Sequence, residues 1–131
     1  DGERGLMPYI YMLRCEDQSL YTGIAKDIRQ RICAHYYKKK TAAKYTKSHP
    51  MKALEMVWET DNWSEAGRLE YYIKQLRREK KEELLLHPEL VNQIDKGKYK
   101  PCREITLEVC LAKEEDSNGQ VETAVGISDG D

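Results

Sequence analysis

Two short β-prone segments, separated by only four polar residues, limit the fold of this chain more than any other feature. Residues 8–15 (PYIYMLRC) and 20–25 (LYTGIA) are apolar and rich in aromatic and β-branched side chains, as strands are. Two strands joined by about four residues, here 16–19 (EDQS), make a hairpin. The folded part of the chain is therefore expected to begin with a hairpin on which later elements pack.

A helix is predicted directly after the hairpin. Asp27 is suited to cap its first turn, and the helix is expected to reach about residue 37. The residues that recur at the spacing of one helical face are Ile28, Arg31, Ile32 and His35. Residues 38–50 are polar and basic, which predicts a loop, with one helical turn at 41–46 as an option.

The next segments alternate between strand and helix patterns. Residues 51–60 (MKALEMVWET) predict a third strand. Asn62 and Glu65 have capping-box spacing, which predicts the start of a second long helix. This helix is expected to run to about residue 81, and the further segments expected to be helical are 81–86 and 89–96.

The whole pattern predicts one small domain of the α/β class, α+β in type, with a three-stranded sheet flanked by helices. Its expected limits are residues 7–100, because Met7 opens the first apolar segment. Residues 104–111 (EITLEVCL) alternate strictly between apolar and polar side chains, which predicts an extra C-terminal edge strand. The remaining limits are 1–6 for a leader or cloning remnant, 101–112 for the edge strand and 113–131 for an acidic tail expected to be disordered.

Charge is distributed unevenly along the chain. Residues 26–52 hold nine Lys or Arg and one acid, Asp27, whereas residues 104–131 hold one Lys and eight acids. A basic face of this kind attracts phosphates by Coulomb attraction and by release of counterions. The charge pattern fits either a nucleic-acid-binding face or a solvated Lys-rich loop.

Several classes of protein are excluded by composition. No apolar run approaches the length needed to span a bilayer, so no membrane partner is expected, and residues 1–6 lack the apolar core of a secretory signal. No C-x-x-C pair of the zinc type is present. The scattered cysteines are Cys15, Cys33, Cys102 and Cys110, a pattern that suits reduced thiols and predicts a cytoplasmic protein.

Five side chains have the chemistry needed to cleave a phosphodiester. Tyr11 and Tyr21 lie on the two hairpin strands, and Arg31 and His35 share one face of the next helix. Arg can donate bidentately to phosphate oxygens, and a Tyr or His can take or pass a proton. Glu70, in the second long helix, is a candidate ligand for a cation such as Mg²⁺, which binds oxygen and often keeps several waters.

Each of these residues also has an ordinary structural explanation. His35 can pack at the end of its helix, and Arg31 can form a surface ion pair of little energetic consequence. Glu70 can pair with Lys74 four residues later, and the two tyrosines can be cross-strand aromatics. Spacing alone leaves these alternatives open.

Three ordered motifs resemble the GIY-YIG nuclease superfamily, and the resemblance favours the catalytic interpretation. They are Tyr9-Ile10-Tyr11, then Tyr21-Thr22-Gly23, then Ala25-x-Asp27-Ile28-x-x-Arg31-x-x-x-His35. Residues 44–50 (KYTKSHP), the third strand and Glu70 with Ile73-Lys74 resemble the small stand-alone YhbQ-like branch of that superfamily. The resemblance covers residues 8–85 and implies a three-stranded antiparallel sheet with flanking helices.

The resemblance also implies roles for individual residues. Tyr11 or Tyr21 would act as general base or position the attacking water, and His35 would assist proton transfer. Arg31 would stabilise the phosphate, and Glu70 would be the single metal-binding glutamate, for Mg²⁺ or Mn²⁺. Residues expected at the substrate, with Gly23 letting the backbone pass close to the site, are Gly23, Lys26, Lys44, Tyr45, Thr46 and Lys47.

The chain departs from the family pattern at a few positions. Tyr9 stands where the motif has Gly and Thr22 where it has Ile, both structural positions. Several relatives carry an Asn about three helical turns after the glutamate, where this chain has Lys81-Glu82-Glu83 and the next Asn is Asn92.

The favoured function is a metal-dependent endonuclease acting on DNA, either structure-selective or of low specificity, with repair or recombination as the expected context. A nucleic-acid-binding module without turnover is the alternative. A third hypothesis is a protein-interaction adaptor or homodimer, formed through the strand expected at residues 104–111.

Overall fold

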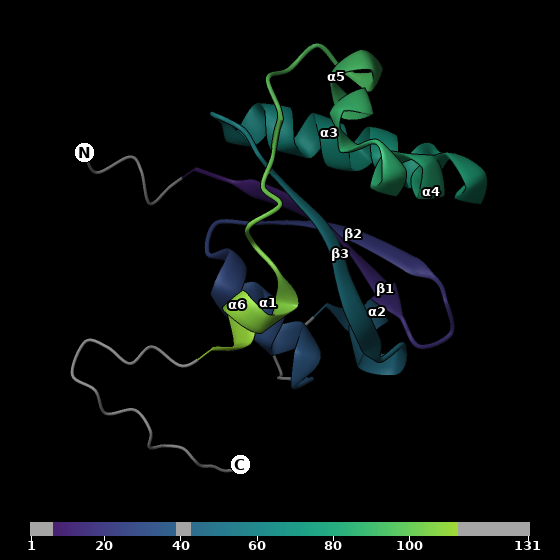
Figure 1. The fold of residues 1–131 in the computed structure, drawn as a ribbon, viewed down its shortest axis with the longest axis vertical. Coiled ribbons are helices and arrows are strands. Elements are labelled where there is room, and N and C mark those ends of the chain that lie inside the picture. Colours follow the sequence, from purple (N-terminus) through teal and green to yellow (C-terminus); the bar gives the residue numbers. More distant parts are fainter. Residues whose placement is uncertain (1–6, 39–42, 113–131) are drawn as a thin grey trace, which may run out of the picture.

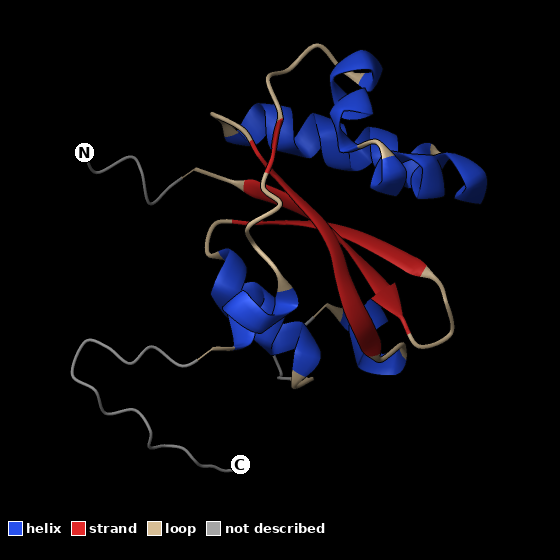
Figure 2. Ribbon diagram, viewed as in Figure 1, coloured by secondary structure: helices blue, strands red, loops and turns tan. Residues whose placement is uncertain are grey.

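An antiparallel four-stranded sheet with the order β2-β1-β3-β4 organises the chain (Figure 1). The computed structural model describes residues 7–38 and 43–112. The strands are β1 (Tyr9–Cys15), β2 (Leu20–Ala25), β3 (Met51–Glu59) and β4 (Lys100–Pro101). The helices are α1 (Ile28–Tyr36), α2 (Lys44–Ser48), α3 (Trp63–Gln75), α4 (Arg78–Leu86), the 3-10 helix η2 (Pro88–Leu90), α5 (Val91–Ile94) and α6 (Leu107–Leu111). The predicted fold class is confirmed: an antiparallel sheet flanked by helices (Figure 2).

The predicted hairpin and helix starts are present. Strands β1 and β2 pair in register from Tyr9 with Ala25 to Arg14 with Leu20. The Asp27 carboxylate accepts a hydrogen bond from the backbone N–H of Gln30, which begins α1. The Asn62 side chain does the same for Glu65 at the start of α3. These caps satisfy amide groups that have no partner within the helix.

Alternation along β1 sends neighbouring side chains into two separate cores. Ile10 and Met12 face α3, α4 and α5, together with Trp58 of β3. Tyr11 and Leu13 face the opposite side, where α1 and α6 pack. Figure 1 shows these two groups of helices on opposite sides of the sheet. The central strand is thus covered on both faces, and Tyr11 lies in the core on the side of α1.

The helix predicted from residue 62 to about 81 is shorter than expected. Helix α3 ends at Gln75, and Leu76 and Arg77 are extended before α4 begins. The break turns α4 back along the sheet, so that Leu84 is buried in the first core. Arg14 of β1 then donates to both carboxylate oxygens of Glu82, at 2.9 and 2.8 Å. The contacts that α4 makes after the break therefore stabilise two helices, although the sequence pattern predicts one continuous helix.

The edge strand predicted at residues 104–111 is wrong. Thr106 caps a helix, since its side chain accepts from the Val109 N–H at 3.2 Å, and Leu107–Leu111 form α6. The short helix buries Cys110 against α1, where the Cys33 thiol donates to the Cys110 carbonyl at 3.3 Å. The sheet gains its fourth strand instead from β4, which pairs with the end of β3. The predicted strand-pairing surface for a partner is therefore not present in this segment.

No helix within residues 7–38 and 43–112 is long and apolar enough to cross a membrane. The segments predicted as a leader, 1–6, and as a disordered acidic tail, 113–131, lie outside the described residues.

Candidate active site

Tyr11 lies at the centre of the candidate site and is only 1% exposed. Its cross-strand partner on β2 is Gly23. A Cβ atom at position 23 would lie 2.5 Å from the Tyr11 hydroxyl oxygen and 2.6 Å from Cζ, so the Tyr11 ring lies directly over the glycine. The missing side chain of Gly23 therefore makes room for the ring.

A chain of hydrogen bonds leads from Tyr11 to helix α2. The Tyr11 hydroxyl lies 2.7 Å from Nε2 of His35, and Nδ1 of His35 lies 2.7 Å from the Thr46 hydroxyl. The Thr46 hydroxyl in turn donates to the backbone carbonyl of Ala43 at 3.1 Å. His35 and Thr46 are both fully buried.

The direction of each bond in this chain can be assigned. Thr46 has one hydroxyl proton, which goes to Ala43, so Thr46 accepts from Nδ1–H of His35. Burial and the charge of Arg31 lower the pKa of His35 to about 4, so the ring is neutral at pH 7 and Nε2 carries no proton. Tyr11 therefore donates to Nε2. Burial raises the pKa of Tyr11, which keeps that proton in place at neutral pH.

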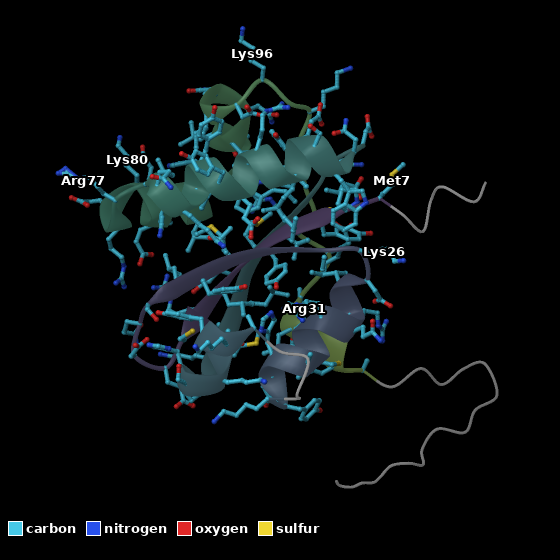
Figure 3. The ribbon with its side chains drawn as sticks, turned by 180° about the vertical axis from the view of Figure 1, so that it is seen from behind. Met7, Lys26, Arg31, Arg77, Lys80 and Lys96 are labelled. Carbon is cyan, nitrogen blue, oxygen red and sulfur yellow. The ribbon has the colours of Figure 1, made fainter. Side chains whose placement is uncertain are left out.

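Arg31 adds a positive charge next to Tyr11. Burial is the main cause of the raised pKa of Tyr11, and the neighbouring Arg31 guanidinium opposes it. Arg31 also lines an open hollow of about 400 Å³ between the end of β2 and α1, with Lys26 and Gln30 among the other lining residues. Lys26 and Arg31 both lie beside α1 in Figure 3. The polar side chains that line the hollow are thus two cations, one amide and the carboxylate of Asp27.

Tyr21 is the tyrosine of the pair that solvent reaches, because it is only partly buried. Its ring lies 6.3 Å from that of Tyr11 and 5.6 Å from that of His35, measured between centroids. On its other side it stacks on Tyr45 at 5.7 Å, and Tyr45 stacks on His49 at 3.9 Å. The aromatic rings thus continue from the buried core to the surface of α2.

Glu70 is connected to Tyr21 through its ion-pair partner. Its carboxylate is paired with Lys74 at 3.1 Å, and the Lys74 ammonium lies 5.7 Å from the centre of the Tyr21 ring. The negative charge of Glu70 contributes to the raised pKa of Tyr11. The ordinary interpretation of Glu70 as a partner of Lys74 is therefore correct, and the carboxylate is nonetheless close to the site.

The donor set fits a hard cation that keeps most of its waters. Within the described part of the chain, no group of three or more His, Cys, Asp or Glu side chains could hold a metal. Glu70 offers one carboxylate that is 24% exposed, and its partner Lys74 is a flexible side chain that is 47% exposed. Mg²⁺ can be bound through one carboxylate together with waters and substrate phosphate oxygens.

The residues predicted to contact a substrate fall into two groups. Lys26, Lys44 and Lys47 are exposed, and the latter two lie on α2. Gly23 and Thr46 are buried, so neither offers a surface to a substrate in this structure. Thr46 is hydrogen-bonded to His35 instead.

Some features of the site were not predicted. The stack of His49 on Tyr45 was missed, although the spacing of four residues was a usable signal. Gln30 in the hollow was also missed and carries no distinctive signal. Asn92 is occupied elsewhere, because its side chain bridges the N–H and carbonyl of Tyr99 at 3.0 Å each.

The chain is similar in sequence to a known family of proteins. Residues 7–83 match the family described as GIY-YIG catalytic domain. A UPF0213 protein of Fusobacterium nucleatum is 47% identical over 81 residues, which cover 62% of this chain and 79% of that protein. A UPF0213 protein of Staphylococcus saprophyticus is 44% identical over 79 residues, or 59% of this chain and 92% of that protein. The solution NMR structure of a UPF0213 protein from Bacillus halodurans has 41% sequence identity and a TM-score of 0.41, over 60% of this chain and 82% of that chain.

Proposed function

Since the chain belongs to the GIY-YIG catalytic domain family, we propose that it is an endonuclease that hydrolyses phosphodiester bonds in DNA with one divalent metal ion at Glu70. The observation that carries the proposal is the packing of the candidate side chains around the two tyrosines. The Tyr11 and Tyr21 rings lie 6.3 Å apart, and Arg31 lines the hollow between β2 and α1. Lys74, which pairs with Glu70, lies 5.7 Å from the centre of the Tyr21 ring. A cation site and a phosphate site are needed together for this reaction.

The proposed role of each side chain follows from whether it is exposed or buried. Arg31 lines the hollow and can donate to the oxygens of the scissile phosphate, where negative charge increases in the transition state. Tyr21 is the accessible phenol and orients the attacking water. Tyr11 and His35 are buried and neutral, so they hold the site together rather than exchange protons with water.

Glu70 would hold the metal, and Mg²⁺ or Mn²⁺ would supply Lewis-acid stabilisation of the phosphate oxygens. A cation held by Glu70 would compete with Lys74, because one carboxylate oxygen lies 3.1 Å from the ammonium group.

The basic side chains on and near α2 extend the site for a polyanion. Lys44 and Lys47 are exposed on the helix that also carries Tyr45, whose ring stacks on Tyr21. Lys26 continues the positive surface on the other side, at the mouth of the hollow. Contacts of this kind bind the phosphate backbone and carry no sequence information, which supports a low-specificity or structure-selective enzyme.

The test is cleavage by a Glu70→Ala variant. The parent is incubated with duplex, nicked, branched and single-stranded DNA, with and without Mg²⁺ or Mn²⁺. Loss of a metal that supplies several kcal/mol to the transition state should reduce the cleavage rate at least about 10²-fold in Glu70→Ala. Glu83→Ala is the matched control, because Glu83 is also a helical glutamate in a surface ion pair, with Lys80 at 3.4 Å.

Two results contradict the proposal. If Glu70→Ala cuts as fast as the parent in Mg²⁺, Glu70 is not the metal ligand. If the parent cuts no substrate but binds DNA equally well in chelator, the protein is a nucleic-acid-binding module without turnover.

A further inference from the structure

A single line of hydrogen bonds runs from the backbone at the start of α2 to the Tyr11 hydroxyl. It passes from the Ala43 carbonyl through Thr46 and His35 to Tyr11, with distances of 3.1, 2.7 and 2.7 Å. Beyond its end, the positive charge of Arg31 acts on the Tyr11 hydroxyl. Three of its side chains are at most 1% exposed, so water does not compete for these bonds.

The order of donors along this line is fixed from the end at α2. The Ala43 carbonyl can only accept, so the Thr46 proton goes there and Nδ1–H of His35 donates to Thr46. A neutral His35 ring has one N–H, so Nε2 accepts and the Tyr11 hydroxyl donates to it. In this arrangement the Tyr11 oxygen keeps its lone pairs for Arg31, which can only donate.

We infer that Thr46 is a positioning residue of this site: it holds His35 in the tautomer protonated at Nδ1, and so keeps the Tyr11 oxygen available to orient Arg31. Thr46 touches neither the substrate nor the metal in this arrangement. The inference about Thr46 and His35 stands on geometry alone, whereas its consequence for catalysis rests on the proposed endonuclease activity.

The alternative tautomer shows what Thr46 prevents. If Nε2 carried the proton, it would donate to the Tyr11 oxygen, and the Tyr11 proton would need another acceptor in a site where Arg31 offers none. A buried hydroxyl without a partner costs about 1–3 kcal/mol. The Tyr11 ring cannot turn toward β2 to find one, because it already lies over Gly23.

The experiment compares three isosteric or conservative variants. Thr46→Val keeps the shape of the side chain and removes the acceptor, and Thr46→Ser restores the hydroxyl. Thr22→Val is the matched control, since Thr22 is 2% exposed and its hydroxyl has no hydrogen-bond partner among the residues that the structure describes. Removing that unpaired hydroxyl should leave the thermal unfolding temperature unchanged or raise it slightly.

Two quantities are measured on each variant. Long-range ¹H–¹⁵N NMR correlations of the full chain, assigned with a His35→Gln variant, report which nitrogen of His35 carries the proton. Cleavage kinetics in Mg²⁺ on the substrate that the parent cuts best give kcat and KM separately. Thermal unfolding of each variant confirms that it is folded before the comparison.

We expect Thr46→Val to lose the Nδ1-protonated form of His35 and to lower kcat with little change in KM. A displacement of about 1 Å of a positioned group can reduce a rate about 10²-fold, which sets the expected loss. Thr46→Ser and Thr22→Val should match the parent in both measurements.

Three outcomes overturn the inference. His35 in Thr46→Val can remain protonated at Nδ1, its tautomer can change with no effect on kcat, or Thr46→Ser can fail to restore the parent behaviour. If the parent cuts no DNA at all, the endonuclease proposal fails separately, and the NMR comparison still decides whether Thr46 sets the His35 tautomer.

Discussion

Replacing Gly23 with alanine places a methyl group where the Tyr11 ring already lies. The new Cβ would be 2.5 Å from the Tyr11 hydroxyl oxygen, 2.6 Å from its Cζ and 3.1 Å from Cε2 of Tyr21. Tyr11 cannot move aside cheaply, because His35 holds its hydroxyl at 2.7 Å in the core. The substitution must therefore displace the ring, the strand or both.

The size of the effect follows from these contacts. Overpacking of a well-packed core costs about 1–3 kcal/mol, and a buried donor that loses its acceptor costs about as much. We expect the free energy of unfolding to fall by about 2–3 kcal/mol. If Tyr11 moves to relieve the overpacking, it loses its hydrogen bond to His35, which costs about as much. For a domain of this size each kcal/mol corresponds to about 4–8 °C, so Tm should fall by about 10–20 °C.

Urea unfolding followed by far-ultraviolet circular dichroism measures the change. Gly67→Ala is the matched control, since a Cβ on Gly67 in α3 meets nothing within 4 Å. That substitution should stabilise the fold by about 0.5–1 kcal/mol, because alanine in a helix loses less chain entropy than glycine. The two Gly→Ala changes should thus have opposite signs.

A double-mutant cycle tests the cause. In a Tyr11→Leu background the nearest atoms to the new methyl are absent, so Gly23→Ala should cost much less than in the parent. An equal cost in both backgrounds would refute the claim that Gly23 exists to admit the Tyr11 ring.

Two further predictions concern pH and salt. The pKa of His35 is about 4 in the folded chain and near 6.5 when unfolded, so the unfolded state binds the extra proton between these values. The free energy of unfolding should therefore fall as pH decreases from 6.5 to 4, by about 3 kcal/mol at most, and urea unfolding of a His35→Gln variant should lack this slope; equal slopes would contradict the buried neutral His35. Replacing Lys44 and Lys47 together by alanine should weaken DNA binding and reduce the salt slope of log K by about 2, as measured by fluorescence anisotropy in chelator, and an unchanged slope would place the DNA elsewhere.

The first three strands and the starts of α1 and α3 could be predicted because their signals are local. The hairpin, the caps at Asp27 and Asn62, and the third strand all follow from residues within a few positions of one another. The segment 104–111 could not be assigned correctly, because its strict alternation suits a strand. Its helix is stabilised by the Thr106 cap and by burial of Cys110 against α1. Cys33 of α1, which contacts Cys110, is 77 residues away along the chain.

The structure brings part of the predicted set of site residues together, and the roles of these residues remain predictions. The rings of Tyr11, Tyr21 and His35 pack against one another, with centroids 5.5 to 6.3 Å apart. The sequence does not indicate which tyrosine is buried, because that depends on the ring of Tyr11 lying over Gly23. The sequence also does not indicate that Thr46 of α2 is buried while the lysines on either side of it are exposed, because the residues of one helical turn face both solvent and core.

The two-sided burial of β1 has a consequence for how such a sequence can diverge. Ile10 and Met12 belong to one core and Tyr11 to the other, so even-numbered and odd-numbered residues of the strand pack into different cores. Deleting or inserting one residue within this strand would exchange the two sets, placing the Tyr11 phenol among the aliphatic side chains and an aliphatic one beside Arg31. Changes of length are therefore tolerated only outside the strand, and descendants of this sequence can vary in the turn at 16–19 while the run from Tyr9 to Leu13 keeps a fixed length.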